Sequence, residues 1–190
     1  GDTAAMDKET TRAEGQRGSE DSLTHLQGLV LARSGRLQLA RRVSRRAVEL
    51  TQQSAAQERG ALFEIGVADW EALFGDETGA RQSVTKALEM SKGRDVEYGA
   101  AVALARVGNS SEAQALMKDL EVRFSADTLV RFMYAPTVRA LVALNRGQPA
   151  AAIDALRAGA SYELGVSGLT DRGFFGGLYP VYGRGDGYLA

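Results

Sequence analysis

Residues 68–80 read ADWEALFGDETGA, and this stretch decides how the chain folds. An apolar helical segment ends at Gly75 and another begins at once, because glycine takes the left-handed conformation that closes a helix without a Cβ clash. A small residue, Ala68, stands seven positions before the glycine, and another, Ala80, stands five positions after it. The stretch therefore predicts two helices that pack closely where these small residues face each other.

The same arrangement recurs at four glycines, Gly35, Gly75, Gly108 and Gly147, which are 40, 33 and 39 residues apart. At each of them, the residue seven positions before and the residue five positions after are Gly or Ala. These eight residues are Gly28, Ala68, Ala101, Ala140, Ala40, Ala80, Ala113 and Ala152. A period of roughly 20–50 residues is typical of stacked repeats. We therefore expect an all-α fold, an α-α superhelix built as a helical-repeat solenoid of about four helix-turn-helix repeats.

Helical periodicity interrupted by glycines runs along the whole chain, so we expect one solenoid domain over residues 1–190. The four repeats are expected at 20–53, 56–92, 94–124 and 128–158. A half repeat is expected at each end, over 1–14 and 178–190, with Gly185 at the small position of the last one. A glycine-rich loop over 159–177 lies before the final half repeat.

The composition limits the chemistry that the chain can perform. Apolar residues make up 44% and charged residues 25%, which is typical of a globular protein, and the net charge of -1 gives no general attraction to nucleic acid. The absence of cysteine removes thiolate metal sites and cysteine nucleophiles, and His25 is the only histidine. No segment approaches about 18 consecutive apolar residues. We expect no cofactor, no metal and no membrane-embedded segment.

The small-residue pattern over residues 22–158 resembles the tetratricopeptide (TPR) repeat, a helix-turn-helix unit of about 34 residues. The chain departs from that family where a large aromatic residue usually stands in the second helix. Those positions hold Ser44, Val84, Met117 and Leu156, and the proline that usually ends the repeat is missing. The resemblance implies degenerate TPR-like units.

Several phrases are also similar to the helical-repeat regions that follow the kinase domain of bacterial eukaryote-like Ser/Thr protein kinases. They are residues 35–37 (GRL), 44–48 (SRRAV), 71–75 (EALFG) and 178–182 (LYPVY). This resemblance implies the regulatory or sensor tail of such a kinase, and the alternative is the TPR tail of a winged-helix transcriptional regulator. Since no kinase motif is present, we expect a non-catalytic chain, in the bacterial cytoplasm or on the extracytoplasmic side of a membrane-anchored kinase.

In TPR arrays the first helix of each unit lines a concave groove, so the resemblance implies a binding site for a peptide or protein segment. The residues that map onto this groove are His25, Arg33, Ile65, Asp69, Tyr98, Arg106, Tyr134, Asn145, Tyr179 and Tyr182. Tyrosine offers a rigid contact area and arginine offers forked hydrogen bonds, and both are frequent at interaction hot spots. For each tyrosine the alternative is packing between neighbouring units.

Three other interpretations stay open. A small-ligand site could form around the glycine-rich loop from Glu163, Asp171, Arg172 and Tyr182. The apolar face of the final helix could be covered by another copy of the chain, giving a homo-oligomer. The basic run from Arg33 to Arg46 is more typical of a solvated helix face than of a nucleic-acid site, so no nucleic-acid partner is expected.

Overall fold

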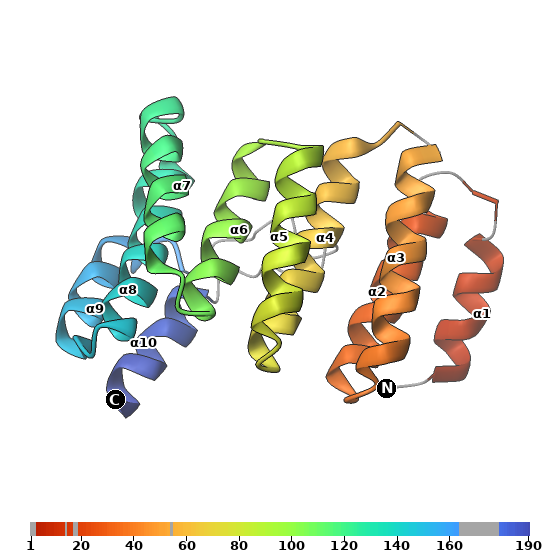
Figure 1. Cartoon of the computed structure of the whole chain (residues 1–190), viewed down its shortest axis with the longest axis horizontal. Coiled ribbons are helices and arrows are strands. Elements are labelled where there is room, and N and C mark those ends of the chain that lie inside the picture. The colour runs from red at the N-terminus through yellow and green to blue at the C-terminus, as the bar shows by residue number, and fades with distance from the viewer. Residues whose placement is uncertain (1–2, 14, 17–18, 54, 164–178) are drawn as a thin grey trace.

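The computed structural model describes residues 3–13, 15–16, 19–53, 55–163 and 179–190, and its regular elements within these ranges are all helices (Figure 1). Four consecutive pairs follow one another along the chain. They are α2 (Glu20–Arg33) with α3 (Leu37–Gln53), α4 (Gln57–Leu73) with α5 (Glu77–Met90), α6 (Arg94–Arg106) with α7 (Ser110–Arg123), and α8 (Ala135–Asn145) with α9 (Pro149–Leu156). The predicted all-helical fold and its pairing are confirmed.

One further helix lies beyond α2 and α3 at one end of the row, and another lies beside α8 and α9 (Figure 1). Helix α1 (Thr3–Ala13) contacts α2, and helix α10 (Tyr179–Leu189) packs against α8 and α9. Gly185 in α10 is exposed, with nothing within 4 Å of the position a Cβ would take. The corresponding residue of the first pair, Gly28, instead lies against Ser44 of α3.

Each pair turns at the predicted glycine. The φ angles of Gly35, Gly75, Gly108 and Gly147 are 75°, 79°, 77° and 66°, which is the left-handed region that glycine enters without steric cost. At the second turn the Asp76 N–H donates to the Glu71 carbonyl oxygen at 2.8 Å, the bond that closes a helix ending of this type. Asp76 also caps α5, because its Oδ1 accepts from the Gly79 N–H at 2.9 Å.

The small residues lie where the sequence predicts. All seven alanines of the pattern are at most 1% exposed, and Gly28 is buried. A Cβ added at Gly28 would lie 2.4 Å from Ser44 Oγ and 3.5 Å from the Ala40 carbonyl oxygen. Close contact between α2 and α3 therefore requires a small residue on α2.

One apolar cluster takes in residues of α4, α5, α6, α7 and α8, whereas Ala152 and Leu156 of α9 belong to a separate cluster with Ala140. The larger cluster includes Ile65 of α4, Val102 of α6 and Val138 of α8, none more than 1% exposed. This cluster fixes successive first helices against one another, since close-packed interiors resist displacement.

The first pair joins α4 differently. Two small apolar clusters lie there, one around Trp70 and one around Phe63. Ion pairs accompany them, from Arg41 of α3 to Glu71 and from Arg59 of α4 to Asp21 of α2. Trp70 is 5% exposed and lies in one cluster with Ala32 of α2 and Ala40 of α3.

Within the repeat predicted over 128–158, a π-helical segment, Val130–Tyr134, stands directly before α8. Pro136 explains it, since proline has no N–H to donate and its ring clashes with the carbonyl four residues earlier, that of Phe132. The wider π turn accommodates the ring without ending the helix. Tyr134 and Ala135 keep helical φ and ψ angles, so the direction of the helix is maintained.

Residues 164–177 of the predicted glycine-rich loop lie outside the described residues. Before them, a short 3-10 helix, Arg157–Gly159, follows α9. Within the described ranges, no helix combines the length and apolar character that crossing a bilayer requires.

Candidate binding surface on the first helices

Four of the predicted groove residues meet in one cluster, which we name the Arg106 cluster: Asp69 of α4, Arg106 of α6, and Tyr179 and Tyr182 of α10. Arg106 Nε lies 3.3 Å from Asp69 Oδ1 as an ion pair. The Tyr179 hydroxyl donates to Asp69 Oδ2 at 2.7 Å, which joins residues 110 positions apart in the chain. The cluster therefore ties the first helices α4, α6 and α10 together.

Both tyrosine rings lie against the arginine. The Arg106 guanidinium carbon is 5.2 Å from the centre of the Tyr179 ring and 5.1 Å from the centre of the Tyr182 ring. These distances are in the range of cation–π attraction. The side chains of Asp69 and Arg106 are mostly buried, whereas Tyr182 is 52% exposed. Tyr182 is therefore the member of the cluster that a partner can reach.

Burial sets the protonation of this cluster. It raises the pKa of the Asp69 carboxyl, and the charge of Arg106 and the hydrogen bond from Tyr179 offset this in part. Burial, followed by the negative charge of Asp69, holds the pKa of the Tyr179 hydroxyl well above its usual value of 10. Tyr179 consequently stays protonated and acts as a donor throughout the neutral range.

Tyr98 and Tyr134 form a second group, inside the stack. Their rings are parallel within 2° with centroids 3.7 Å apart, and both residues are buried. The Tyr134 hydroxyl donates to Asp95 Oδ1 at 2.8 Å. For these two tyrosines the structure favours the alternative of packing between neighbouring units.

The remaining predicted residues lie apart from both groups. Ile65 and His25 are fully buried, and the His25 ring stacks on Phe63 with centroids 4.2 Å apart and an 11° interplanar angle. Arg33 and Asn145 are exposed. Asn145 Nδ2 donates to the Ala105 carbonyl oxygen at 2.7 Å, so it links the end of α8 to the end of α6.

Sequence reasoning missed the ionic contacts that surround these tyrosines. Arg94 pairs with Asp95 and with Asp127, at 2.9 and 2.7 Å, and its guanidinium carbon lies 5.8 Å from the Tyr134 ring centre. A signal was available in α4, where the acids Glu64, Asp69 and Glu71 interrupt an apolar run. Charged residues in such a run are usually buried together with a partner.

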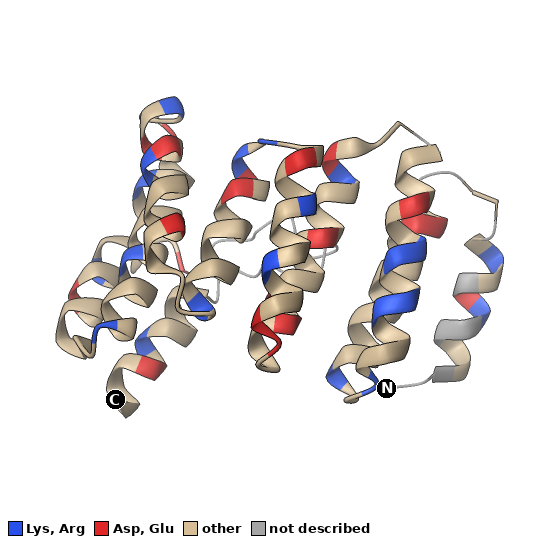
Figure 2. Cartoon of the chain, in the orientation of Figure 1, with Lys and Arg blue, Asp and Glu red and all other residues tan. Residues whose placement is uncertain are grey.

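The basic run on α3 is partly neutralised. Arg41 pairs with Glu71 and Asp76, and Arg46 lies 3.7 Å from Glu49. Figure 2 shows basic and acidic positions interspersed along α5 and α7.

The structure describes only two of the four residues predicted for a small-ligand site, Glu163 and Tyr182. Glu163 forms a bidentate ion pair with Arg184 of α10. Asp171 and Arg172 lie outside the described residues. In the part of the chain that the structure describes, no three His, Cys, Asp or Glu residues gather as a metal site.

Comparisons with protein-family models, with curated proteins and with solved structures gave no match. The helix pairs and the Arg106 cluster therefore carry the functional argument.

Proposed function

We propose that this chain is a non-catalytic interaction module that holds a peptide or protein segment against its first-helix face, the surface formed by α2, α4, α6, α8 and α10. The observation that carries the proposal is the exposed Tyr182 ring over the guanidinium of Arg106, which forms an ion pair with Asp69. A rigid aromatic side chain over a fixed cation is typical of interaction hot spots.

The arrangement of α10 supports a concave shape for this face. Helix α10 packs against α8 and α9, yet its first residue, Tyr179, bonds to Asp69 of α4. A flat row of first helices would separate α10 from α4 by about two further helix diameters of roughly 10 Å each. Curvature of this kind gives repeat arrays their extended binding surfaces.

A non-catalytic role agrees with the position of His25. The single histidine is packed in the interior against Phe63, where it cannot exchange protons with a bound substrate.

The wider context follows from the resemblance to TPR-like kinase tails. We propose that the module is the regulatory or sensor tail of a bacterial Ser/Thr protein kinase, with the tail of a winged-helix regulator as the second candidate. The reading frame that encodes the chain tests this directly. A kinase domain in the same protein would support the first candidate, and a winged-helix domain would favour the second.

Peptide selection tests the binding surface. Peptides enriched from a displayed random library against the whole chain should bind Tyr182→Ala about tenfold more weakly than the wild type, the loss of a hot-spot residue. The matched control is Tyr188→Ala, since Tyr188 is a 72% exposed tyrosine of the same helix and is not placed on Arg106. Peptides that bind both variants and the wild type equally would refute the proposed surface.

A further inference from the structure

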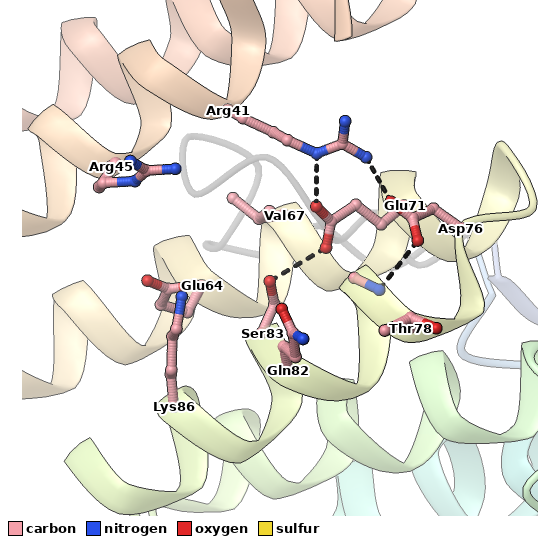
Figure 3. Close-up of a pocket in the computed structure, with 11 residues that line it drawn as sticks. Arg41, Arg45, Glu64, Val67, Glu71, Asp76, Thr78, Gln82, Ser83 and Lys86 are labelled. Atoms are coloured by element: carbon pink, nitrogen blue, oxygen red, sulfur yellow. Dashed lines mark hydrogen bonds and ion pairs between the residues drawn. The ribbon is translucent and has the colours of Figure 1, made fainter. Parts of the chain in front are cut away.

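A cavity of about 260 Å³ lies between α3 and α5, with α4 as its floor (Figure 3). We name it the α3–α5 cavity. Its floor is formed by Glu64, Val67 and Glu71, which follow one face of α4 at helical spacing. Asp69 stands two positions from Val67 and therefore projects from another side of the helix. The cavity is thus separate from the first-helix face.

One end of the cavity is a completed network. Arg41 Nε donates to Glu71 Oε1 at 3.0 Å, and its terminal nitrogen donates to Asp76 Oδ2 at 2.5 Å. The Ser83 hydroxyl donates to Glu71 Oε2 at 3.0 Å. Both oxygens of Glu71 are therefore occupied, and this end carries one cation and two anions.

The other end of the cavity is incomplete. Glu64 is only 9% exposed, yet its carboxylate has no hydrogen bond and no ion pair among the described residues. Arg45 and Lys86 lie at the same end and are exposed, likewise without an ion pair in the described ranges (Figure 3). Burial raises the pKa of Glu64; Lys86 and Arg45 lower it in part, and Glu71 raises it further. The side chain of Glu64 is thus mostly buried, and its carboxylate faces the cavity without a hydrogen bond within the part of the chain that the structure describes.

The charges around the cavity define what could complete it. The lining holds three cations, Arg41, Arg45 and Lys86, and three anions, Glu64, Glu71 and Asp76. A simple anion would be repelled by Glu64, and a simple cation by Arg45 and Lys86. Because Arg41, Glu71 and Asp76 pair with one another, the charges left for a ligand are the anion Glu64 and the cations Arg45 and Lys86. A ligand that carries both an ammonium and a carboxylate group matches this end of the cavity best. The volume lies just below the roughly 300–1,000 Å³ of typical ligand pockets, so the ligand is small.

We infer that the α3–α5 cavity binds a small zwitterion of the α-amino-acid type. Its ammonium group donates to the Glu64 carboxylate, and its carboxylate accepts from Arg45 and Lys86. The remainder of the ligand lies over Val67, which is apolar, and extends toward the network at Glu71. This binding site is independent of the first-helix face and of the function proposed for it.

Calorimetric titration of the whole chain tests the inference. The probes are glycine, serine, leucine, lysine and glutamate, with methylamine and acetate as ligands that carry only one of the two charges. At least one amino acid should bind at millimolar concentration or below, with shifts of the Gly79 and Ser83 amide resonances, and neither single-charge ligand should do so. Absence of binding by all five amino acids would overturn the inference.

A variant at Glu64 tests the mode of binding. Glu64→Gln should weaken the amino acid by about 10- to 100-fold, the effect of losing one charge-assisted hydrogen bond. Glu89→Gln is the matched control, because Glu89 is an exposed acid of α5 that does not line the cavity. Equal binding by the two variants would refute the assigned role of Glu64.

Two further measurements on Glu64→Gln, its unfolding midpoint and its peptide binding, distinguish loss of the amino-acid site from misfolding. Glu64→Gln removes an unpaired buried charge, so its unfolding midpoint should not fall, and loss of binding cannot then reflect misfolding. Peptides selected through Tyr182 should bind Glu64→Gln undiminished. If no amino acid binds, the proposed peptide-binding role of the first-helix face is therefore unaffected. If Tyr182→Ala binds the selected peptides as the wild type does, the inference about the cavity is likewise unaffected.

Discussion

The contacts between successive helix pairs, which we call joints, differ in chemistry along this molecule. The second pair meets the third through one continuous apolar cluster that includes Ile65 and Val102. The first pair meets the second through two smaller clusters and through ion pairs, of which Arg41–Glu71 is the best connected. The polar joint also encloses the α3–α5 cavity, whereas the apolar one consists of residues that are almost fully buried.

This difference predicts which part of the chain should unfold locally at the lowest free energy. Apolar burial contributes net stability in proportion to area, whereas the attraction within a buried ion pair is largely offset by desolvation of its charges. The polar joint sets the orientation of the first pair but stabilises it less. We therefore expect residues 20–53 to open locally at a lower free energy than the following pairs.

The largest expected effect lies at the apolar joint. Ile65→Ala removes a fully buried side chain from the continuous cluster and should lower the free energy of unfolding by about 2–5 kcal/mol. Denaturant titration measures this loss. Val122→Ala, at a residue that is 72% exposed, should change the same quantity by less than about 0.5 kcal/mol. Comparable losses in the two variants would contradict the assigned core.

The contact inside a pair offers the next test. Ala113 is fully buried at the small position of α7, so Ala113→Leu should overpack the pair and cost about 1–3 kcal/mol. Thermal unfolding followed by circular dichroism gives the shift in midpoint. Ala4 of α1 is exposed and should accept leucine without loss. If Ala113→Leu melted with the wild type, the small residues would not be setting the distance between helices.

A smaller and more local effect is expected at the polar joint. Arg41→Met keeps the apolar stem but leaves Glu71 without its cation, which should cost about 1 kcal/mol because Arg41 is partly solvated. Amide hydrogen exchange should accelerate in α2 and α3 more than in α6. Arg42→Met is the control, since Arg42 is the exposed neighbour and has no ion pair in the described ranges. Uniform acceleration along the chain would show that the two joints are equivalent.

The smallest effect is a pH dependence at Glu64. Its pKa is raised above the unfolded value of 4.5, so the folded state holds this proton more tightly and wild-type stability gains as the pH falls. Glu64→Gln lacks this gain. The variant should be more stable at pH 7 by under about 1 kcal/mol, and the difference should shrink toward pH 5. Urea unfolding midpoints of both proteins at the two pH values measure it, and a difference that does not change with pH would contradict the shift.

The helices and their pairing could be predicted because their causes are local. Glycine at positive φ ends a helix wherever it stands, and small residues at a fixed spacing mark close contacts. The π segment before α8 was not predicted, although Pro136 was visible, because the sequence does not say whether a helix will break or widen there.

The candidate site was harder to predict because its contacts are long-range. The sequence placed Asp69, Arg106 and Tyr182 on one surface only through the resemblance to TPR repeats. It could not show that Tyr179 reaches Asp69, since the two residues are 110 positions apart and no local pattern links them. It could not separate buried tyrosines such as Tyr98 from exposed ones, because both occupy the same repeat position.

The bond between Tyr179 and Asp69 has a consequence for how the molecule folds. In a linear array each unit senses only its immediate neighbours, so stability adds up unit by unit and folding can start anywhere. Here the last helix is fastened to the second pair, and a loop of more than a hundred residues must close before that bond forms. A substitution that destabilises α10 should therefore also destabilise α4, and the reverse. This coupling makes unfolding more cooperative than a sum of nearest-neighbour contacts.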